Sequence, residues 1–366
     1  MRIDAFDYDL PAEQIAQHPT VDREAARLLV MARGGSEGAD DTTLEHRTIT
    51  ELADLIPEGS LVVLNDTRVI SARLRGVKVT GGKVEIFLVR KLGTRRVDGT
   101  EVEVWRAMGK GGKALKFGSD IEVGTLRIHL LGRADDGLLE VGLSVRSGDS
   151  VDDAIAREGH VPLPPYIKRD DAVDDRERYQ TVFARVDGAI AAPTAGLHLT
   201  RALLGRLAVR GCEVANVTLH VGLGTFQPVS VEDLDDHPMH SERYEVSRAT
   251  ATAIARARDR GAKVFAVGTT VVRALESAHD PDRDGLVCAG AGDTSLLIQP
   301  GYRFRVVDML LTNFHVPKST LLALTCAFGG TERVMAAYRT AVLEKYRFFS
   351  YGDAMLLSRA ETEKAS

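Results

Sequence analysis

Hydrophobic and polar positions follow two different patterns along the chain. Between about residues 70 and 147, short runs alternate apolar and polar residues and are separated by glycines, which is typical of antiparallel strands. Segments 76–79 and 83–89 are expected to pair as a hairpin, with Gly81 and Gly82 supplying positive φ in the turn. We expect a closed barrel, since closure protects the edges of many short strands.

Three further segments of this block also have the pattern of strands. One strand is predicted over 101–105. Segments 121–131 and 138–145 are expected to form a second hairpin across the turn 134–137. No helical periodicity interrupts them, so the whole block is predicted to be β-structure.

The rest of the chain alternates helical stretches with short β-rich runs, the pattern of an α/β domain. The alanine-rich segment 249–260 predicts a helix that stops at Gly261, because glycine favours the position after a helix. A buried strand is predicted over 263–267. The β-rich run at 61–64 shows that this pattern also precedes the β-rich block.

Two strand-to-helix turns are the first candidates for a ligand site. The turn 268–270 leads into a helix over 271–278, whose free N–H groups favour a polar or anionic ligand. A strand over 306–311 leads through the polar turn 312–317 into a helix that begins near Ser319. In open α/β sheets, ligands bind at such carboxyl ends of strands.

Because the α/β pattern lies on both sides of the β-rich block, we interpret the block as an insertion. The predicted fold class is α/β. It combines a discontinuous α/β sandwich body over 1–69 and 148–366 with an inserted small antiparallel β-barrel domain over 70–147.

Composition excludes several classes of protein. A chain of 366 residues with 44% hydrophobic content can bury a sizeable core in about two domains. The longest apolar candidate, 306–328, is interrupted by polar and charged residues, and no secretory signal precedes residue 20. Cys212, Cys288 and Cys326 fit neither a disulfide framework nor a metal knuckle. We expect a cytoplasmic protein without a membrane segment.

Charge is concentrated in one segment. The net charge is -5, yet segment 68–96 contains nine basic residues against the single acidic residue Glu85. Arg73, Arg75 and then Lys78 follow at nearly every second position, so one strand face can present them together. Such a face would neutralise phosphates, and the segment is therefore predicted to bind a polyanion rather than to be only a solvated charged face.

Three polar segments, 192–198, 219–226 and 312–315, each place a histidine next to a predicted element end. Glycine lets backbone approach a ligand closely, and histidine exchanges protons near neutral pH. The alternative is that these glycines only make turns and that the histidines are structural. A metal is not expected, because His237, His240 and Glu242 are not on a regular helix.

Motifs spread over nearly the whole chain carry a resemblance to a known family. They are FDYDLP (6–11), NDTRVI (65–70), GGKVE (81–85), GHVPLPPYI (159–167), ERYQT (177–181), AAPTAGLH (191–198), VTLHVG (217–222), GTFQPV (224–229), MHSE (239–242), GTTVVRALES (268–277), TNFHVPKSTLL (312–322) and YGDAM (351–355). In these motifs the chain resembles the S-adenosylmethionine:tRNA ribosyltransferase-isomerase family of the queuosine pathway. Ser71 and Leu199 depart from the family's usual proline and phenylalanine.

The resemblance implies an enzyme with two substrates. The ribosyl part of S-adenosylmethionine would be transferred to 7-aminomethyl-7-deazaguanine at the wobble position of a tRNA, giving epoxyqueuosine and releasing adenine and methionine. S-adenosylmethionine would be consumed as a co-substrate, with no permanently bound cofactor and no metal. We expect a monomer whose partners are S-adenosylmethionine and the tRNA.

The resemblance also implies site residues. We assign acid/base roles to His220 and His315, with Glu242 as a competing base and His198 as a further candidate. An aromatic face such as Phe226 or Tyr244 would hold the sulfonium. The predicted substrate-binding residues are Asn65, Asp66, Arg68, Thr194, Gly196, Gly222, Gly224, Phe226, Gly268, Thr269, Thr270, Arg273 and Asn313. The predicted tRNA contacts are Arg73, Arg75, Lys78, Lys83, Arg90 and Lys91.

Two alternative functions remain open from the sequence. An S-adenosylmethionine-dependent RNA methyltransferase would use the same cofactor and partner but would break a different bond. A non-catalytic RNA-binding module would retain tRNA without consuming cofactor, although it would have no need of the polar turns.

Overall fold

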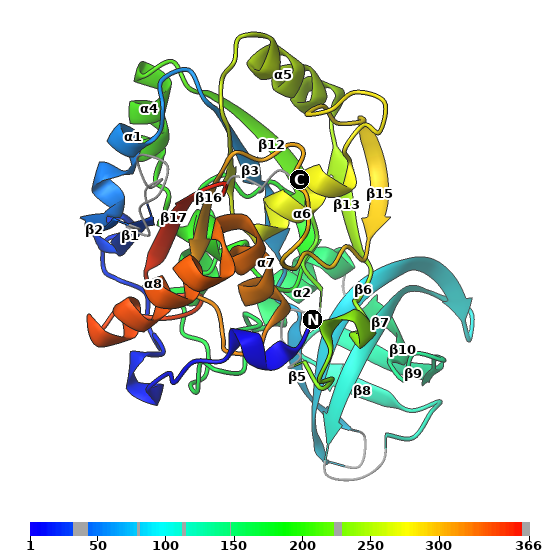
Figure 1. Cartoon of the computed structure of the whole chain (residues 1–366). Helices are drawn as coiled ribbons and strands as arrows, with labels where there is room; N and C mark the ends of the chain where they lie inside the picture. The colour runs from blue at the N-terminus through cyan, green and yellow to red at the C-terminus, as the bar shows by residue number, and fades with distance from the viewer. Residues whose placement is uncertain (32–42, 79–80, 112–114, 147, 223–228, 361–366) are drawn as a thin grey trace.

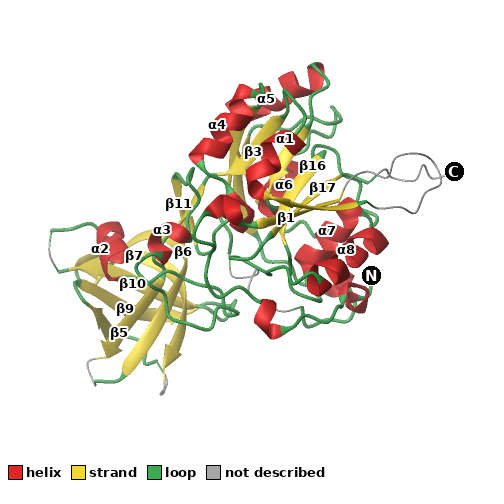
Figure 2. Cartoon of the chain, turned by 90° about the vertical axis from the view of Figure 1, so that its left-hand side faces the viewer, coloured by secondary structure: helices red, strands yellow, loops and turns green. Residues whose placement is uncertain are grey.

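The computed structural model describes residues 1–31, 43–78, 81–111, 115–146, 148–222 and 229–360. It has two parts, a large α/β body and a β-barrel that projects from one side of it (Figures 1 and 2). The predicted α/β body with an inserted antiparallel barrel is confirmed.

A mixed sheet forms the centre of the body. Within the described residues it has nine strands, in the order β15-β13-β12-β3-β14-β16-β17-β1-β2. The central strands β12, β3, β14 and β16 run parallel, so their carboxyl ends share one edge of the sheet. The strands are β1 (Arg27–Met31), β2 (Leu44–Thr48), β3 (Leu61–Asn65), β12 (Glu213–Leu219), β13 (Glu242–Val246), β14 (Val264–Val267), β15 (Gly290–Thr294), β16 (Met309–Asn313) and β17 (Ala354–Ser358).

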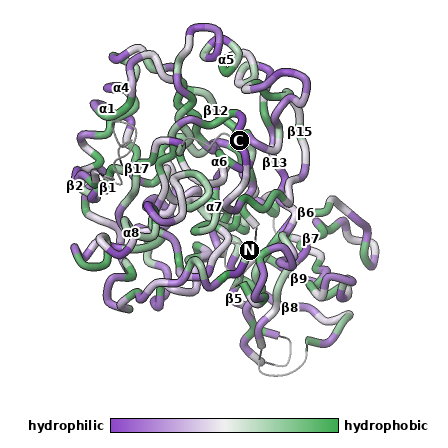
Figure 3. The backbone as a smooth tube through the Cα atoms, viewed as in Figure 1, coloured by the Kyte–Doolittle hydropathy of each residue, from purple (hydrophilic) through white to green (hydrophobic). Residues whose placement is uncertain are grey.

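Helices cover both faces of this sheet. Alternation along β1 divides the core, because Leu28 and Val30 join one apolar cluster while Leu29 and Met31 join the other. One face packs against α1 (Leu52–Leu55) and α4 (Arg201–Val209). The other packs against α5 (Arg248–Asp259), α6 (Thr269–Ser277), α7 (Thr320–Gly329) and α8 (Thr331–Leu343). Figure 3 shows apolar positions along the central strands and hydrophilic ones along outer elements such as α5.

Local signals placed close to their observed bounds most of the body elements that were predicted individually. Helix α5 ends before Gly261, whose φ of 68° is the left-handed conformation expected after a helix. Strand β16, however, begins at Met309 rather than at residue 306. The N–H groups of Val306 and Val307 donate to the buried carboxylate of Glu276 at 3.0 and 3.1 Å, so they are unavailable to the sheet.

The barrel closes in the order β10-β7-β6-β5-β8-β9. The predicted hairpin of its first two strands is confirmed, and Gly81 alone of the two turn glycines has positive φ, at 83°. The prediction of one strand over 121–131 is wrong, because Gly124 turns left-handed and divides it into two strands. The strands are β5 (Arg73–Lys78), β6 (Lys83–Val97), β7 (Thr100–Gly111), β8 (Asp120–Val123), β9 (Leu126–Arg133) and β10 (Leu139–Val145).

Two short strands mark where the chain leaves and re-enters the body. β4 (Thr67–Val69) precedes the barrel and pairs in parallel with β11 (Val186–Ala189), which follows it. Helix α2 (Val151–Glu158) packs on β9 and β10, and α3 (Asp175–Arg178) lies in the connection back to the body. None of the helices in the described ranges is both long and apolar enough to cross a bilayer.

Candidate functional site

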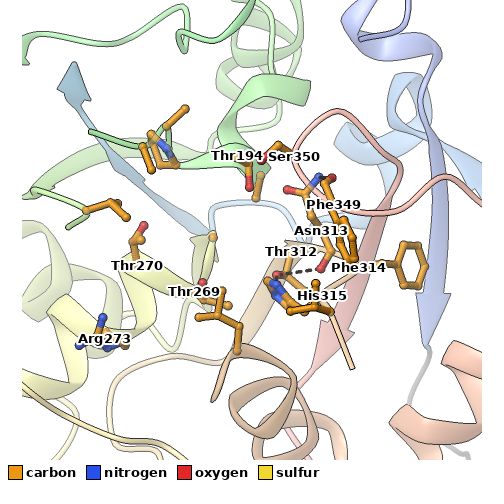
Figure 4. A pocket seen from close by; sticks show the side chains of 18 of the residues that line it. Thr194, Thr269, Thr270, Arg273, Thr312, Asn313, Phe314, His315, Phe349 and Ser350 are labelled. Atoms are coloured by element: carbon orange, nitrogen blue, oxygen red, sulfur yellow. Dashed lines mark hydrogen bonds between the residues drawn. The ribbon is translucent and has the colours of Figure 1, made fainter. Parts of the chain in front are cut away.

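A pocket lies where the parallel strands of the body end (Figure 4). Its wall includes Val221 just after β12, residues 268–270 after β14, and residues 312–316 at the end of β16. Residues 191–195 close another side. The two turns singled out in the sequence therefore meet in one pocket, as expected for the carboxyl edge of parallel strands.

The first turn of α6 forms one side of the pocket. Gly268 has φ of 98°, a conformation that permits the abrupt passage from β14 into the helix. Thr269 and Thr270 follow, and the first N–H groups of a helix lack acceptors within it. Asn65 fixes this turn, because its amide donates to Thr270 Oγ1 at 3.2 Å and to the carbonyl of Leu219 at 3.0 Å.

Glu242 and Arg273 form a buried ion pair in the same wall. Their exposed fractions are 5% and 9%, and the guanidinium contacts Glu242 Oε2 directly. Glu242 Oε1 accepts the N–H of Gly222 at 2.9 Å, and Arg273 Nε donates to the carbonyl of Leu296. The carboxylate predicted as a competing base is therefore already bound to a cation and an amide.

His315 is the histidine that lines the pocket. Its Nε2 lies 2.8 Å from Thr312 Oγ1, and its backbone N–H donates to the hydroxyl of Tyr338. The Thr312 hydroxyl also lies 3.3 Å from the carbonyl of Asn313. The Thr312 hydroxyl can donate to the Asn313 carbonyl and accept from His315 at the same time if Nε2 of His315 carries the proton. Nδ1 of His315 is then an acceptor. Burial lowers the pKa of His315 to about 3, so the imidazole is neutral near pH 7.

His198 lies behind the pocket wall and acts on it through Asn313. The Asn313 amide nitrogen lies 3.2 Å from His198 Nε2 and donates to the carbonyl of Phe349 at 3.0 Å. Since an amide nitrogen only donates, His198 Nε2 must be an acceptor here. Burial, together with the charge of Arg23, lowers the pKa of His198 to about 4 and keeps that nitrogen unprotonated.

Aromatic residues that the sequence did not assign complete the pocket. The hydroxyls of Tyr166 and Ser350 share a hydrogen bond of 2.6 Å, and the ring centroids of Tyr166 and Phe349 lie 4.7 Å apart. Tyr179 also lines the wall. Tyr166 and Tyr179 occur in the motifs at 159–167 and 177–181, whereas Phe349 and Ser350 lie just before the last motif. Their roles depend on contacts between distant segments, which the motifs alone did not reveal.

Several predicted site residues lie near the pocket but do not line it. His220 Nδ1 lies 2.8 Å from Thr67 Oγ1, and burial, reinforced by Arg243, lowers the pKa of His220. The Asp66 carboxylate accepts from Thr218 Oγ1 at 2.7 Å and pairs with Arg185. The structure thus separates His220 from the pocket that contains His315.

Arg68 and Gly196 also lie outside the lining. Arg68 is exposed and donates to the carbonyl of Ala184 at 2.7 Å. Gly196 packs tightly, because a Cβ there would lie 2.8 Å from the ring of Phe183 and 2.9 Å from Thr181 Cγ2. The role that the structure indicates for Gly196 is close packing.

The remaining predicted residues have different positions. Thr194, like the residues of the two turns, is part of the lining. Gly224 and Phe226 fall within 223–228 and so lie outside the described residues. Tyr244 is partly buried, with its hydroxyl 3.4 Å from the carbonyl of Ser277. Where side chains are described, no group of three or more His, Cys, Asp or Glu is arranged to hold a metal ion.

The basic segment of the barrel is partly neutralised by neighbouring acids. Arg73 pairs with Glu85 at 2.8 Å, and Arg75 pairs with Asp170 in the connection that follows the barrel. Lys91 pairs with Glu103 at 2.8 Å. The predicted contacts Lys83 and Arg90 are exposed, as Arg75 and Lys91 are, but neither forms an ion pair with a residue that the structure describes. The positive field of this segment is therefore weaker than its sequence indicates.

Comparison with known proteins gives matches along the whole chain. The model of a family described as "Queuosine biosynthesis protein" matches residues 3–357. A Sorangium cellulosum protein named S-adenosylmethionine:tRNA ribosyltransferase-isomerase is 56% identical over 372 residues, covering 98% of both chains. An Anaeromyxobacter protein of the same name is 53% identical and covers 99% of this chain and 100% of its own.

A solved structure agrees with these matches. The crystal structure of S-adenosylmethionine tRNA ribosyltransferase from Thermotoga maritima is 34% identical in sequence, with a TM-score of 0.53. The similarity covers 96% of this chain and 99% of that one. The likeness therefore includes both the α/β body and the barrel.

Proposed function

We propose a function for this chain on the ground that it belongs to the queuosine biosynthesis protein family. The chain is an S-adenosylmethionine:tRNA ribosyltransferase-isomerase, which transfers and isomerises the ribosyl part of S-adenosylmethionine onto a tRNA base. Identity of 56% over nearly the full length of a relative with that name carries this conclusion. The relatives favour ribosyl transfer over the methyltransferase alternative, since their names specify a ribosyltransferase.

We also propose specific substrates for the reaction. The acceptor is 7-aminomethyl-7-deazaguanine at the wobble position of a tRNA, and the product is epoxyqueuosine. S-adenosylmethionine is consumed, and adenine and methionine leave. A tRNA acceptor is consistent with a cytoplasmic enzyme, and the chemistry needs no permanently bound cofactor.

His315 is our choice for the residue that moves the proton. The sulfonium acidifies the C5′ protons of S-adenosylmethionine, and the His315 imidazole, which lines the pocket and is neutral near pH 7, has an unprotonated nitrogen to accept one of them. As the ribose ring opens, the bond between C1′ and adenine breaks, and the imidazolium returns the proton to adenine. The aminomethyl nitrogen then attacks the ribosyl chain, and methionine leaves as its thioether.

The side of the pocket formed by α6 is suited to the methionine end of the substrate. Free N–H groups and the helix dipole at Thr269 and Thr270 favour a carboxylate. Arg273 adds a cation there, while its pairing with Glu242 keeps the local charge balanced. Glu242 then acts as a structural partner of Arg273 rather than as the base.

The barrel is our proposed contact for the tRNA backbone. Exposed Lys83 and Arg90 support this role. Arg73, Arg75 and Lys91 contribute less, because each is already paired with a carboxylate.

One assay tests the reaction directly. Purified protein is incubated with S-adenosylmethionine and with tRNA that carries the aminomethyl-deazaguanine, and the nucleosides and small products are identified by mass. We expect epoxyqueuosine, adenine and methionine in equal amounts. Formation of S-adenosylhomocysteine instead would establish methyl transfer and overturn the proposal.

A further inference from the structure

Two buried polar atoms of the pocket make no hydrogen bond of normal geometry with any residue that the structure describes, although Ser350 and the backbone of Ala192 lie near the second of them. They are the side-chain oxygen of Asn313 and the hydroxyl of Tyr179. The two residues are only 2% and 1% exposed, and both line the pocket. Buried polar atoms in folded proteins nearly always have partners, because an unpaired one costs free energy. Two in one pocket indicate a ligand that supplies the missing partners.

The orientation of Asn313 is fixed by the groups around its nitrogen. Nδ2 faces the carbonyls of Phe349 and Asp353 at 3.0 and 3.5 Å and the Nε2 of His198 at 3.2 Å. Exchanging the amide oxygen and nitrogen would set Oδ1 against two carbonyl oxygens, which repel it. Oδ1 is therefore held as a hydrogen-bond acceptor for the ligand.

The walls around these atoms are flat and apolar. Phe349 and Phe314 line the pocket on the same side as Asn313 in the view of Figure 4, away from Arg273 and the first turn of α6. Small residues at 191–195 form a further part of the lining. A planar ring fits between aromatic and small apolar side chains, where its faces are removed from water.

We propose that Asn313, Tyr179 and Phe349 form the subsite for the adenine ring of S-adenosylmethionine. Adenine presents an amino N–H beside a ring nitrogen, so the amino group donates to Asn313 Oδ1 and the ring nitrogen accepts from the Tyr179 hydroxyl. This inference rests on the proposed function, because S-adenosylmethionine brings the adenine.

The modified tRNA base is a less suitable occupant of this subsite. Its aminomethyl group is cationic in its ordinary protonated form and would need a carboxylate nearby. Among the described residues of the lining, the single carboxylate is Glu242, and it is already bound to Arg273 and Gly222. Adenine carries no charge and needs no such partner.

The subsite fixes the direction of the substrate in the pocket. With adenine at Asn313 and the methionine carboxylate at Thr269 and Thr270, the ribose lies between the two ends. His315 lies two positions after Asn313 in the chain, and both residues line the same wall of the pocket. The imidazole is then placed to take a C5′ proton and to return it to the departing adenine.

Free purine bases test the subsite without turnover. Equilibrium binding of adenine, purine and hypoxanthine to the full chain is measured by competition with S-adenosylmethionine. We expect adenine to bind at least about 10-fold more tightly than purine, which lacks the amino donor, and than hypoxanthine, which replaces it with an acceptor. In Asn313→Ala the preference for adenine over purine should fall to about 2-fold or less.

Tyr179→Phe is the cleaner variant, since it keeps the ring and removes only a hydroxyl that forms no hydrogen bond of normal geometry with the protein. We expect about 10-fold weaker adenine binding and a similar rise in the KM for S-adenosylmethionine. Thr181→Val is the matched control, because it removes another unpartnered buried hydroxyl that does not line the pocket. It should leave both values unchanged.

The outcomes separate the subsite from the proposed function. If folded Tyr179→Phe and Asn313→Ala bind the three bases as the unmodified protein does, the subsite is wrong, even when adenine and methionine are still released from S-adenosylmethionine. Tighter binding of hypoxanthine than of adenine would also overturn it, because hypoxanthine carries the carbonyl group of the tRNA base, which would then be the occupant. If adenine binds as expected while turnover gives S-adenosylhomocysteine, the proposed function fails and the subsite stands.

Discussion

The Asn313 amide nitrogen lies 3.2 Å from Nε2 of His198, although the two residues are 115 positions apart in the chain. His198 is the last residue of a short 3-10 helix, and Asn313 ends strand β16. Because the amide can only donate, the contact requires a neutral imidazole whose Nδ1 carries the proton. This arrangement turns the oxygen of Asn313 toward the pocket and gives His198 a positioning role in place of direct proton transfer.

Replacing His198 should weaken substrate binding more than it slows the reaction. In His198→Phe the amide of Asn313 loses an acceptor and can rotate, so we expect the KM for S-adenosylmethionine to rise about 10-fold with a smaller change in kcat. His198→Gln keeps a side-chain acceptor and should recover much of the loss. His129→Gln, on the barrel, is the control. A fall confined to kcat would return His198 to the acid/base candidates.

His315→Gln should abolish most turnover while leaving binding of S-adenosylmethionine largely intact. Loss of a positioned proton-transfer group typically lowers rates by about 10²–10⁴-fold. The same change at His220, which contacts Thr67 outside the pocket lining, should have a much smaller effect. Single-turnover adenine release and a separate binding assay distinguish the two. Equal losses of rate in both variants would support the original assignment of a shared acid/base role.

Glu242→Gln should destabilise the fold. It leaves the guanidinium of Arg273 buried without its partner, and breaking such a pair typically costs about 3–5 kcal/mol. The double variant Glu242→Gln/Arg273→Met removes both charges and should recover part of this loss. Arg146→Gln, which breaks an exposed pair with Glu122, should cost less than about 1 kcal/mol. Urea denaturation measures all three, and a stable Glu242→Gln protein would contradict the expectation.

The fold should lose stability on acidification at pH values well above those at which carboxylates titrate. In the unfolded chain, His198 and His315 take up protons near their usual pKa of 6.5, whereas burial holds their folded pKa near 4 and 3. The unfolded state then binds more protons, so stability falls as pH drops from about 6.5 toward 4. Each histidine should remove about 2 kcal/mol by pH 5.

Denaturation curves at pH 7, 6 and 5 measure this loss. His198→Gln should flatten the pH dependence. An unchanged slope in His198→Gln would show that this imidazole is not buried in its neutral form.

Charge reversal on the barrel should weaken tRNA binding. We expect Lys83→Glu and Arg90→Glu to act through lost phosphate contacts, because both side chains are exposed. Each lost contact should reduce the slope of log K against log salt concentration by about 1. Reversing Arg73 or Arg75 instead breaks ion pairs with Glu85 or Asp170, so folding must be checked alongside binding. Unchanged binding in the Lys83 and Arg90 variants would leave the segment as a solvated charged face.

Prediction of the fold from sequence succeeded where the signal was local. Helix α5 ends before Gly261 as predicted, and alternation identified the strands of the barrel. It failed at Gly124, which divides a predicted strand in two, and where one distant side chain intervened. Val306 and Val307 have the composition of a strand, but Glu276 takes their N–H groups, and nothing near residue 306 in the sequence indicates this.

Prediction of the site was mixed for the same reason. The turns at 268–270 and 312–315 were found because glycines, threonines and a histidine at strand ends are visible in the sequence. The pairing of Glu242 with Arg273 was not predicted, because a motif shows which residues are present but not which residue neutralises their charge. Tyr166 and Tyr179 were inside recognised motifs without an assigned role.

The sequence by itself determined the family, the two-part architecture and the strand-end turns that hold the pocket, because periodicity, turn residues and motifs are properties of neighbouring positions. Only the tertiary structure decided which histidine faces the pocket. His198, His220 and His315 have similar local settings in sequence, yet the parallel sheet brings the end of β16 to the pocket and leaves the other two imidazoles against Asn313 and Thr67. Burial and hydrogen-bond partners set proton affinity, and for His198 and His220 the partners come from segments more than a hundred residues away in the chain.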